Sequence, residues 1–232
     1  MNNPENYYSS GAVIELDDNS RARFISRTYG HLTAAIFAFV GIEVFLFSSG
    51  MAESMAAFML QGSWLLILGG FMVVGWFATR IAHSSVSKSA QYAALAGYVV
   101  AESIIFVPLL WMAQQFAPGA ISSAALVTFL GFAGLTAIVF ITKKDFSFLR
   151  GLIMWGGVLA LVAIVAFTIF GGDGTWFSVL MVGLAGAAVL YDTSNVLHHY
   201  TEDRYVGAAL QLFASIALMF WYVLRIFMGS RN

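Results

Sequence analysis

Seven long apolar stretches recur along the 232-residue chain, and short polar segments separate them. Each stretch is close to the length of about 20 residues that an α-helix needs to cross a bilayer. The stretches are Tyr29–Ser49, Trp64–His83, Tyr92–Ala113, Ile121–Ile141, Gly151–Phe170, Trp176–Leu197 and Gly207–Met228. The pattern predicts an all-α membrane protein whose seven transmembrane helices form one domain over residues 29–228.

Basic residues divide the polar segments into two groups. The N-terminal flank and the second, fourth and sixth loops carry lysine or arginine, whereas the loops around Glu53, Pro118 and Asp173 carry neither. The basic residues are Arg21, Arg23, Arg27, Arg80, Lys88, Lys143, Lys144, Arg150 and Arg204. Because cytoplasmic loops are enriched in lysine and arginine, we expect a cytoplasmic N-terminus. Arg225, near the outer end of the last stretch, is an exception to this asymmetry.

The two ends of the chain are polar. Residues 1–28 contain Pro4 and an acidic patch, so we expect a flexible cytoplasmic tail, and residues 229–232 form a second, short tail. The N-terminal segment lacks the layout of a cleavable signal peptide. We therefore expect the first helix to be retained.

Composition narrows the class of function. Hydrophobic residues make up 60% of the chain and charged residues only 10%, against about 25% charged residues in typical soluble domains. We therefore expect the folded chain to lie in the lipid bilayer. The formal net charge of −1 provides no basic field for nucleic acid. The absence of cysteine excludes disulfides and thiolate metal sites, and we expect no cofactor.

Three carboxylates, Glu43, Glu102 and Asp192, fall within apolar stretches. Ionisable groups in a bilayer usually face a partner or a water-filled cavity, so each is a candidate site. At a rise of about 1.5 Å per residue, Asp192 lies about 7–8 Å and Glu102 about 15 Å from the cytoplasmic ends of their stretches. Glu43 falls in the outer half. Two interpretations stay open: a cation or proton path, or neutral acids hydrogen-bonded to neighbouring helices.

Arg80 lies near the cytoplasmic end of the second stretch. Its long side chain can extend outward to the membrane surface or turn inward to a carboxylate. Both roles remain open from the sequence.

Three short strings carry a family resemblance. They are Lys143–Leu149 (KKDFSFL), Leu190–Thr193 (LYDT) and Leu224–Phe227 (LRIF). In this order and spacing they resemble the Bax inhibitor family, also called the transmembrane Bax inhibitor motif family, and the resemblance runs from about Arg23 to Phe227.

The resemblance implies a bundle in which six helices surround a central seventh, working as a pH-sensitive calcium leak. In bacterial members, aspartates on the sixth and seventh helices form a gate with an arginine on the second. Asp192 matches the first aspartate and Arg80 matches the arginine. The resemblance also implies a bacterial inner (cell) membrane location, and Ca²⁺ or H⁺ as the transported ion.

The second gate aspartate is replaced by Ser215, which lies ten residues before Arg225. A serine cannot share a proton with Asp192, so the coupled titration of a carboxylate pair is not expected here. Glu102 has a similar estimated depth, which makes an Asp192–Glu102 pair our substitute hypothesis.

The alternative function is a non-transporting regulator that binds another membrane protein, such as a membrane protease or a stress-response factor. We do not expect an enzyme: Asp173 and Asp192 fall at opposite membrane faces, and the two aspartates of an aspartyl protease must meet. His198 and His199 lie at the cytoplasmic rim, and the sequence leaves any bound metal undetermined.

Overall fold

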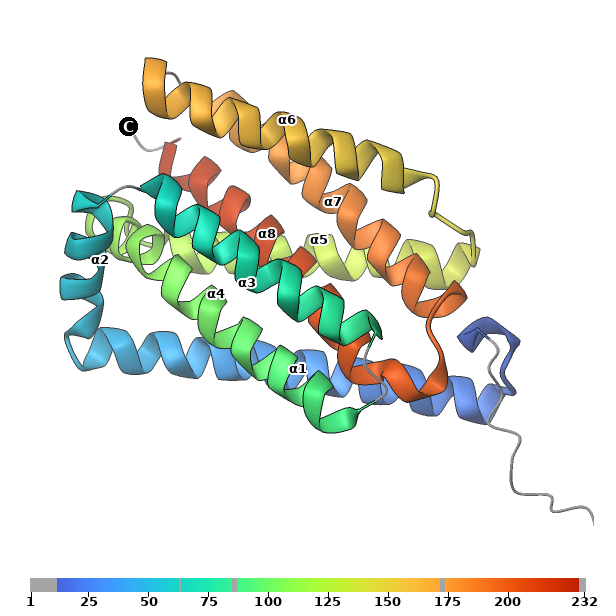
Figure 1. The fold of residues 1–232 in the computed structure, drawn as a ribbon. Helices are drawn as coiled ribbons and strands as arrows, with labels where there is room; N and C mark the ends of the chain where they lie inside the picture. The colour runs from blue at the N-terminus through green and yellow to red at the C-terminus, as the bar shows by residue number, and fades with distance from the viewer. Residues whose placement is uncertain (1–11, 63, 85–86, 172–173, 230–232) are drawn as a thin grey trace, which may run out of the picture.

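The structure, a computed structural model, describes residues 12–62, 64–84, 87–171 and 174–229, and these residues are overwhelmingly helical. The helices are α1 (Asp18–Ser48), α2 (Met51–Gln61), α3 (Trp64–Ser84), α4 (Lys88–Phe116), α5 (Ala120–Thr142), α6 (Leu149–Phe170), α7 (Gly174–His198) and α8 (Tyr205–Gly229) (Figure 1). Two 3-10 turns, Val13–Glu15 and Glu202–Arg204, precede α1 and α8. The predicted all-α bundle is confirmed.

Six of these helices, α1 and α4 to α8, are each long and apolar enough to cross a membrane. The pair α2 and α3 meets the same criterion together, across a bend of 110°, so the described residues provide six spans, or seven with this pair. The α3 helix coincides with the predicted second span. The segment around Glu53, expected as a loop, instead forms α2, which lies across one end of the bundle (Figure 1).

Local sequence features explain why α2 forms. Its sequence is rich in alanine, methionine and leucine, which are strong helix formers. Gly50 takes a positive φ of 77° between α1 and α2, a conformation that glycine adopts without steric cost. The chain therefore turns at Gly50 and starts a new helix.

The first helix begins eleven residues earlier than predicted, at Asp18 rather than Tyr29. Asp17 caps it, because its carboxylate accepts hydrogen bonds from the backbone N–H groups of Asn19 (3.0 Å) and Ser20 (3.1 Å). Before the cap, Val13 is fully buried, and its N–H donates to the Tyr200 carbonyl at 3.0 Å. The predicted flexible tail is thus ordered from residue 12 onward, and residues 1–11 lie outside the described part, as do 230–232.

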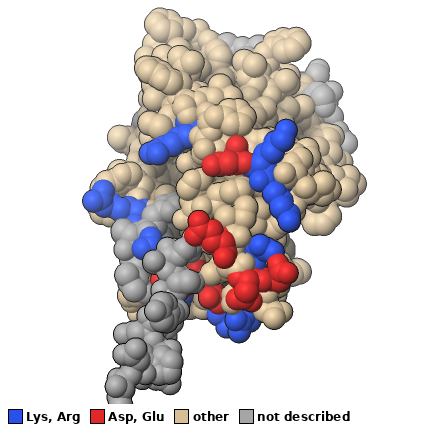
Figure 2. Space-filling view, turned by 90° about the vertical axis from the view of Figure 1, so that its right-hand side faces the viewer, with Lys and Arg blue, Asp and Glu red and all other residues tan. Residues whose placement is uncertain are grey.

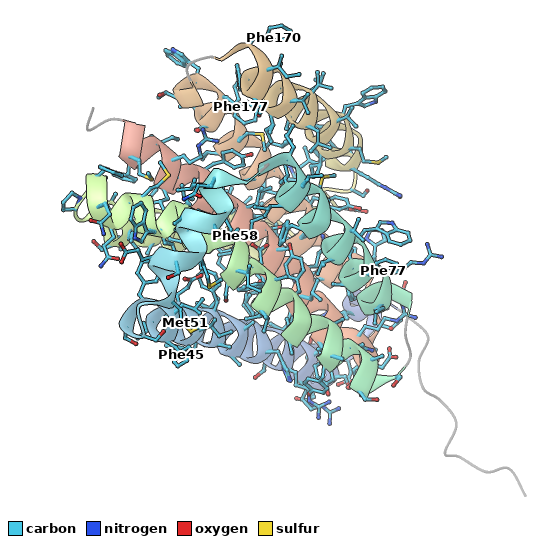
Figure 3. The ribbon with its side chains drawn as sticks, turned by 60° about the vertical axis from the view of Figure 1, so that its left-hand side comes forward. Phe45, Met51, Phe58, Phe77, Phe170 and Phe177 are labelled. Carbon is cyan, nitrogen blue, oxygen red and sulfur yellow. The ribbon has the colours of Figure 1, made fainter. Side chains whose placement is uncertain are left out.

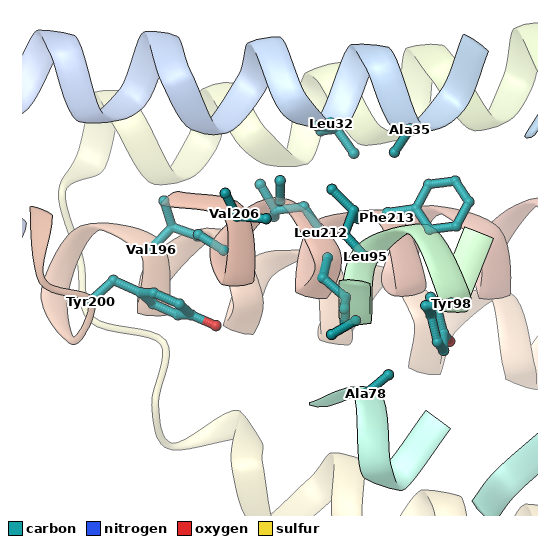
Figure 4. Close-up of a cluster of buried hydrophobic side chains, with 14 of the residues drawn as sticks. Leu32, Ala35, Ala78, Leu95, Tyr98, Val196, Tyr200, Val206, Leu212 and Phe213 are labelled. Atoms are coloured by element: carbon teal, nitrogen blue, oxygen red, sulfur yellow. The ribbon is translucent and has the colours of Figure 1, made fainter. Parts of the chain in front are cut away.

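The C-terminal helix α8 occupies the centre of the bundle. It packs against α1, α3, α4, α5 and α7, as the resemblance implies for the last helix (Figure 1). A cluster of buried side chains joins α8 to these helices, including Leu32, Tyr98, Val196 and Phe213 (Figure 4). By contrast, α6 packs mainly on α7 and leaves most of its surface exposed.

Apolar side chains cover the outside of the bundle. Phe58 is 79% and Phe170 84% exposed, and Phe45 and Phe77 also point outward (Figure 3). So large an apolar surface is stable only where lipid replaces water. The protein is therefore an integral membrane protein.

Charged side chains gather at one end of the molecule, where α1, α4, α6 and α8 begin (Figure 2). Contacts tie the segments at this end together: Lys88 Nζ donates to the Asp203 carbonyl, and His31 Nε2 lies 2.9 Å from the Tyr92 hydroxyl. We call this the charged end. Its cytoplasmic placement remains a prediction from the loop charges.

Candidate functional site

Asp192, on α7, is buried with 2% of its surface exposed, and α8 supplies its hydrogen-bond donors. The Ser215 hydroxyl donates to Oδ2, and Gln211 Nε2 donates to Oδ1 at 3.1 Å. Ser215 and Gln211 lie one helical turn apart, so they present neighbouring donors on the same face of α8. Both oxygens of the carboxylate are therefore satisfied by neutral groups.

A cavity of about 860 Å³ adjoins this carboxylate. It lies between α3 and α4 on one side and α6 and α7 on the other, with α8 along its length. Its lining on α8 runs from Gln211 to Gly229, which is about 27 Å at about 1.5 Å per residue. This length approaches the hydrocarbon thickness of a bilayer, about 30 Å.

Glu102, on α4, lines the same cavity and is 5% exposed. The Tyr98 hydroxyl, one turn earlier on α4, is its hydrogen-bond partner. Glu102 and Asp192 therefore share a cavity while each carboxylate is held by a different set of side chains. Pro108 also lines the cavity, one to two turns further along α4.

Arg80 lies at the end of α3, and its side chain is exposed. Its guanidinium carbon is 5.4 Å from the centroid of the Trp76 ring, a cation–π arrangement. Arg80 does not line the cavity. In this conformation Asp192 is thus bonded to Ser215 and Gln211, while Arg80 is placed on the outer surface of α3.

Glu43, on α1, is also buried, with 7% of its surface exposed. Neither carboxylate oxygen has a hydrogen-bond partner among the described residues. It does not line the cavity, and Leu46, on the next turn, packs against α2 and α4 through Ala52, Ala56 and Val107. The structure therefore separates Glu43 from the other two carboxylates.

The sequence pattern did not predict two hydrogen-bond partners of the buried carboxylates, Gln211 and Tyr98. A signal for each was present, because Gln211 precedes Ser215 by four residues and Tyr98 precedes Glu102 by four. Residues four apart lie on one helical face. A search for polar residues at that spacing around the buried acids would have found both.

The loop from α5 to α6 docks on the end of α7 and brings the Lys143–Leu149 string against residues that follow the Leu190–Thr193 string. The Phe146 N–H donates to the Ser194 hydroxyl at 2.8 Å, and His199 Nε2 lies 4.0 Å from Asp145 Oδ2. The Ser147 N–H donates to Asp145 Oδ1 at 2.9 Å. This bond, with smaller contributions from His199 and His198, holds the pKa of Asp145 below its usual value.

Within the described ranges, no three histidine, aspartate or glutamate side chains converge on a place for a metal ion. His198 and His199 instead belong to the loop contact, where His198 Nδ1 lies 2.9 Å from the Ser194 carbonyl. Asp173, the acidic residue of the loop before α7, lies outside the described residues.

Comparison with known proteins identifies relatives in bacteria and eukaryotes. An uncharacterised protein of Pseudomonas aeruginosa is 29% identical over 227 residues, which cover 96% of each chain. Bax inhibitor 1 of Schizosaccharomyces pombe is 25% identical over 96% of this chain and 82% of its own. The modulator of FtsH protease YccA of Escherichia coli is 33% identical over 109 residues, 46% of this chain and 48% of that protein.

A family model, inhibitor of apoptosis-promoting Bax1, matches residues 21–232. This range contains all but the first three residues of α1, all of the later spans, the buried carboxylates and the loop contact described above. The chain therefore belongs to the Bax inhibitor family.

Proposed function

We propose that the protein is a pH-sensitive leak for cations, calcium or protons, with the cavity along α8 as its path and Asp192 at its gate. One observation carries the proposal: two carboxylates, Asp192 and Glu102, line a cavity that follows the central helix for most of the membrane thickness. Carboxylates beside a membrane cavity attract cations and bind protons. The charged end faces the cytoplasm in this proposal.

The described conformation is the closed one. Val206 and Leu210, which precede Gln211 on α8, are both fully buried, and Tyr200, just after α7, is nearly so. Figure 4 shows Val206 and Tyr200 in this part of the bundle. These side chains belong to the apolar cluster that joins α7 and α8 to their neighbours. Conduction therefore requires α8 to move relative to α7.

The charge on Asp192 is linked to that movement. An ionised carboxylate accepts the hydrogen bonds of both Ser215 and Gln211. A protonated carboxyl carries a donor on one oxygen and loses part of its capacity to accept. Protonation thus weakens the bonds that hold α7 against α8, which makes opening depend on pH.

Flux in proteoliposomes tests the proposal. Wild-type protein, reconstituted alone with a calcium or pH indicator inside the vesicles, should give a pH-dependent leak. Asp192→Asn should remove the pH dependence, because the amide cannot titrate. Glu43→Gln is the matched control, since it neutralises a buried carboxylate outside the cavity, and it should retain the wild-type profile. Equal effects of the two variants would contradict a gate at Asp192.

Glu102→Gln tests the hypothesis that Glu102 acts with Asp192 in place of the second aspartate. We expect a shifted pH profile, because the cavity loses one of its two carboxylates. An unchanged profile in Glu102→Gln would exclude this role and leave Asp192 as the sole titrating group of the gate.

The second candidate is a modulator of a membrane protease, which the similarity to the E. coli modulator of FtsH protease favours. Such a regulator should produce no leak when reconstituted alone. It should instead change the rate at which co-reconstituted FtsH degrades a membrane substrate. Measuring both activities on one preparation distinguishes the two functions.

A further inference from the structure

The end of the cavity away from Asp192 is built around Arg225, the arginine that breaks the loop-charge asymmetry. Arg225 is half-buried on α8 and lines the cavity together with Gly174 and Thr175, from the first turn of α7. A Cβ atom added at Gly174 would lie 2.7 Å from Arg225 Nη2. The guanidinium therefore rests directly on the first turn of α7, in space that the missing side chain leaves open.

The charge at this end is positive. The first turn of a helix presents backbone N–H groups that lack intrahelical partners, and its dipole favours negative charge. Arg225 adds a full positive charge beside it. The described lining residues at this end, which also include Ser178 and Tyr222, contain no carboxylate. Among the described residues at this end, the positive charge therefore has no carboxylate beside it, and an anion would complement it.

The cavity between Arg225 and Ser215 is apolar. Its lining there includes Phe106, Leu109, Leu218 and Trp221. The separation of ten residues on α8 corresponds to about 15 Å, half of the hydrocarbon core of about 30 Å. An acyl chain from one leaflet has this length. The volume of about 860 Å³ is also within the usual range for ligand sites, about 300–1,000 Å³.

We propose that this half of the cavity binds an anionic phospholipid, with its phosphate on Arg225 and one acyl chain lying along α8 toward Ser215. A soluble anion would use Arg225 but would leave the apolar length unfilled. The helices that flank the cavity, α3 and α6, carry exposed apolar side chains such as Leu66 and Leu159, so lipid surrounds this part of the bundle. A lipid bound here would occupy half of the cavity in the closed conformation and would have to leave before an ion could pass along α8. The proposal rests on the cavity and not on the leak, so binding is measurable in protein that conducts nothing.

Native mass spectrometry of the purified full-length protein tests the site. The probes are phosphatidylglycerol and phosphatidylcholine with identical acyl chains, titrated into the detergent-solubilised protein. Phosphatidylglycerol should form a one-to-one complex, and Arg225→Gln should weaken it about tenfold, because a charge-assisted hydrogen bond to phosphate is lost. Arg80→Gln, which removes an arginine outside the cavity, should bind like the wild type.

Two further variants keep the test informative if Arg225→Gln folds poorly. Gly174→Ala displaces the guanidinium and should weaken binding, while Arg225→Lys keeps the charge and should bind with intermediate affinity.

A fluorescence experiment locates the acyl chain. Phosphatidylglycerol brominated on its acyl chains should quench the fluorescence of the wild type more than that of Trp221→Phe, because Trp221 lines the cavity.

Three outcomes would overturn the proposal. Equal binding of phosphatidylcholine would exclude recognition of the anion. Unchanged binding in both Arg225→Gln and Gly174→Ala would place the lipid elsewhere. Competition by glycerol 1-phosphate as effective as that by the lipid would show a site for free anions without an acyl chain.

Discussion

Asp192 and Glu43 are both buried carboxylates within apolar helices, yet their surroundings differ. Asp192 accepts hydrogen bonds from Ser215 and Gln211 and adjoins a cavity along the central helix. Glu43 is almost as deeply buried, but both of its oxygens lack hydrogen-bond partners among the described residues. The same functional group thus has hydrogen-bond donors at one site and none among the described residues at the other.

The difference shows that burial alone does not identify a functional carboxylate. A buried polar group without a partner lowers stability, whereas one with matched donors stabilises the packing of the helices that supply them. Partners on a second helix also make the contact sensitive to the charge of the acid. Asp192 meets this condition, whereas Glu43 has no hydrogen-bond partner among the residues that the structure describes.

The largest change in the free energy of unfolding is expected when Asp192 is replaced by a residue that accepts no hydrogen bonds. Asp192→Leu leaves the buried Ser215 hydroxyl and the half-buried Gln211 amide without this acceptor, which should lower the free energy of unfolding by about 2–4 kcal/mol. Thermal unfolding in detergent, followed by circular dichroism, measures this. Asp192→Asn retains an acceptor oxygen and should lose less. Equal losses in the two variants would mean that the hydrogen bonds are not what stabilises this contact.

Replacing Glu43 is expected to raise the free energy of unfolding rather than lower it. Glu43→Met replaces an unpartnered carboxyl with an apolar side chain of similar length, and should raise the free energy of unfolding by about 1–3 kcal/mol. The same unfolding measurement applies. A lower stability in Glu43→Met would show that this carboxyl does have a stabilising partner, and would remove the contrast with Asp192.

A smaller change is expected at Ser215. Ser215→Ala removes one of the two donors to Asp192 while Gln211 remains, so the free energy of unfolding should fall by about 1 kcal/mol. Ser122→Ala provides a matched control, because that hydroxyl is exposed and donates to the Gly119 carbonyl at the start of its own helix. A loss no greater than in Ser122→Ala would show that Ser215 fills space rather than holding Asp192.

The smallest effect is expected at Asp145, an exposed carboxylate in the loop contact. Its folded pKa is lowered chiefly by the Ser147 N–H, so its stabilising contribution is present above the unfolded value of about 3.9. That contribution is lost as the pH falls through the folded value. Asp145→Asn should cost less than about 1 kcal/mol at neutral pH. The difference from wild type should shrink in acid, and a difference that is constant with pH would contradict this assignment.

The sequence by itself determined the class of fold, the family and the shared end of the charged loops. Apolar stretches of membrane-spanning length and the distribution of arginine and lysine are properties of local composition, so they can be read without knowing which helices touch. The strings around Asp145, Asp192 and Arg225 identified the family for the same reason. The start of α1 and the existence of α2 were missed, although the Asp17 cap and Gly50 were visible as local signals.

Only the tertiary structure decided which polar groups meet. Depth along a helix was estimated from the sequence, but the direction in which a side chain points around that helix depends on the neighbours against which it packs. Packing of α8 at the centre brought Ser215 and Gln211 to Asp192, placed Glu102 on the same cavity, and left Glu43 outside it. It also set Arg225 on the first turn of α7, at the far end of that cavity. Each of these relations joins residues of different helices, for which the pattern along a single chain carries no signal.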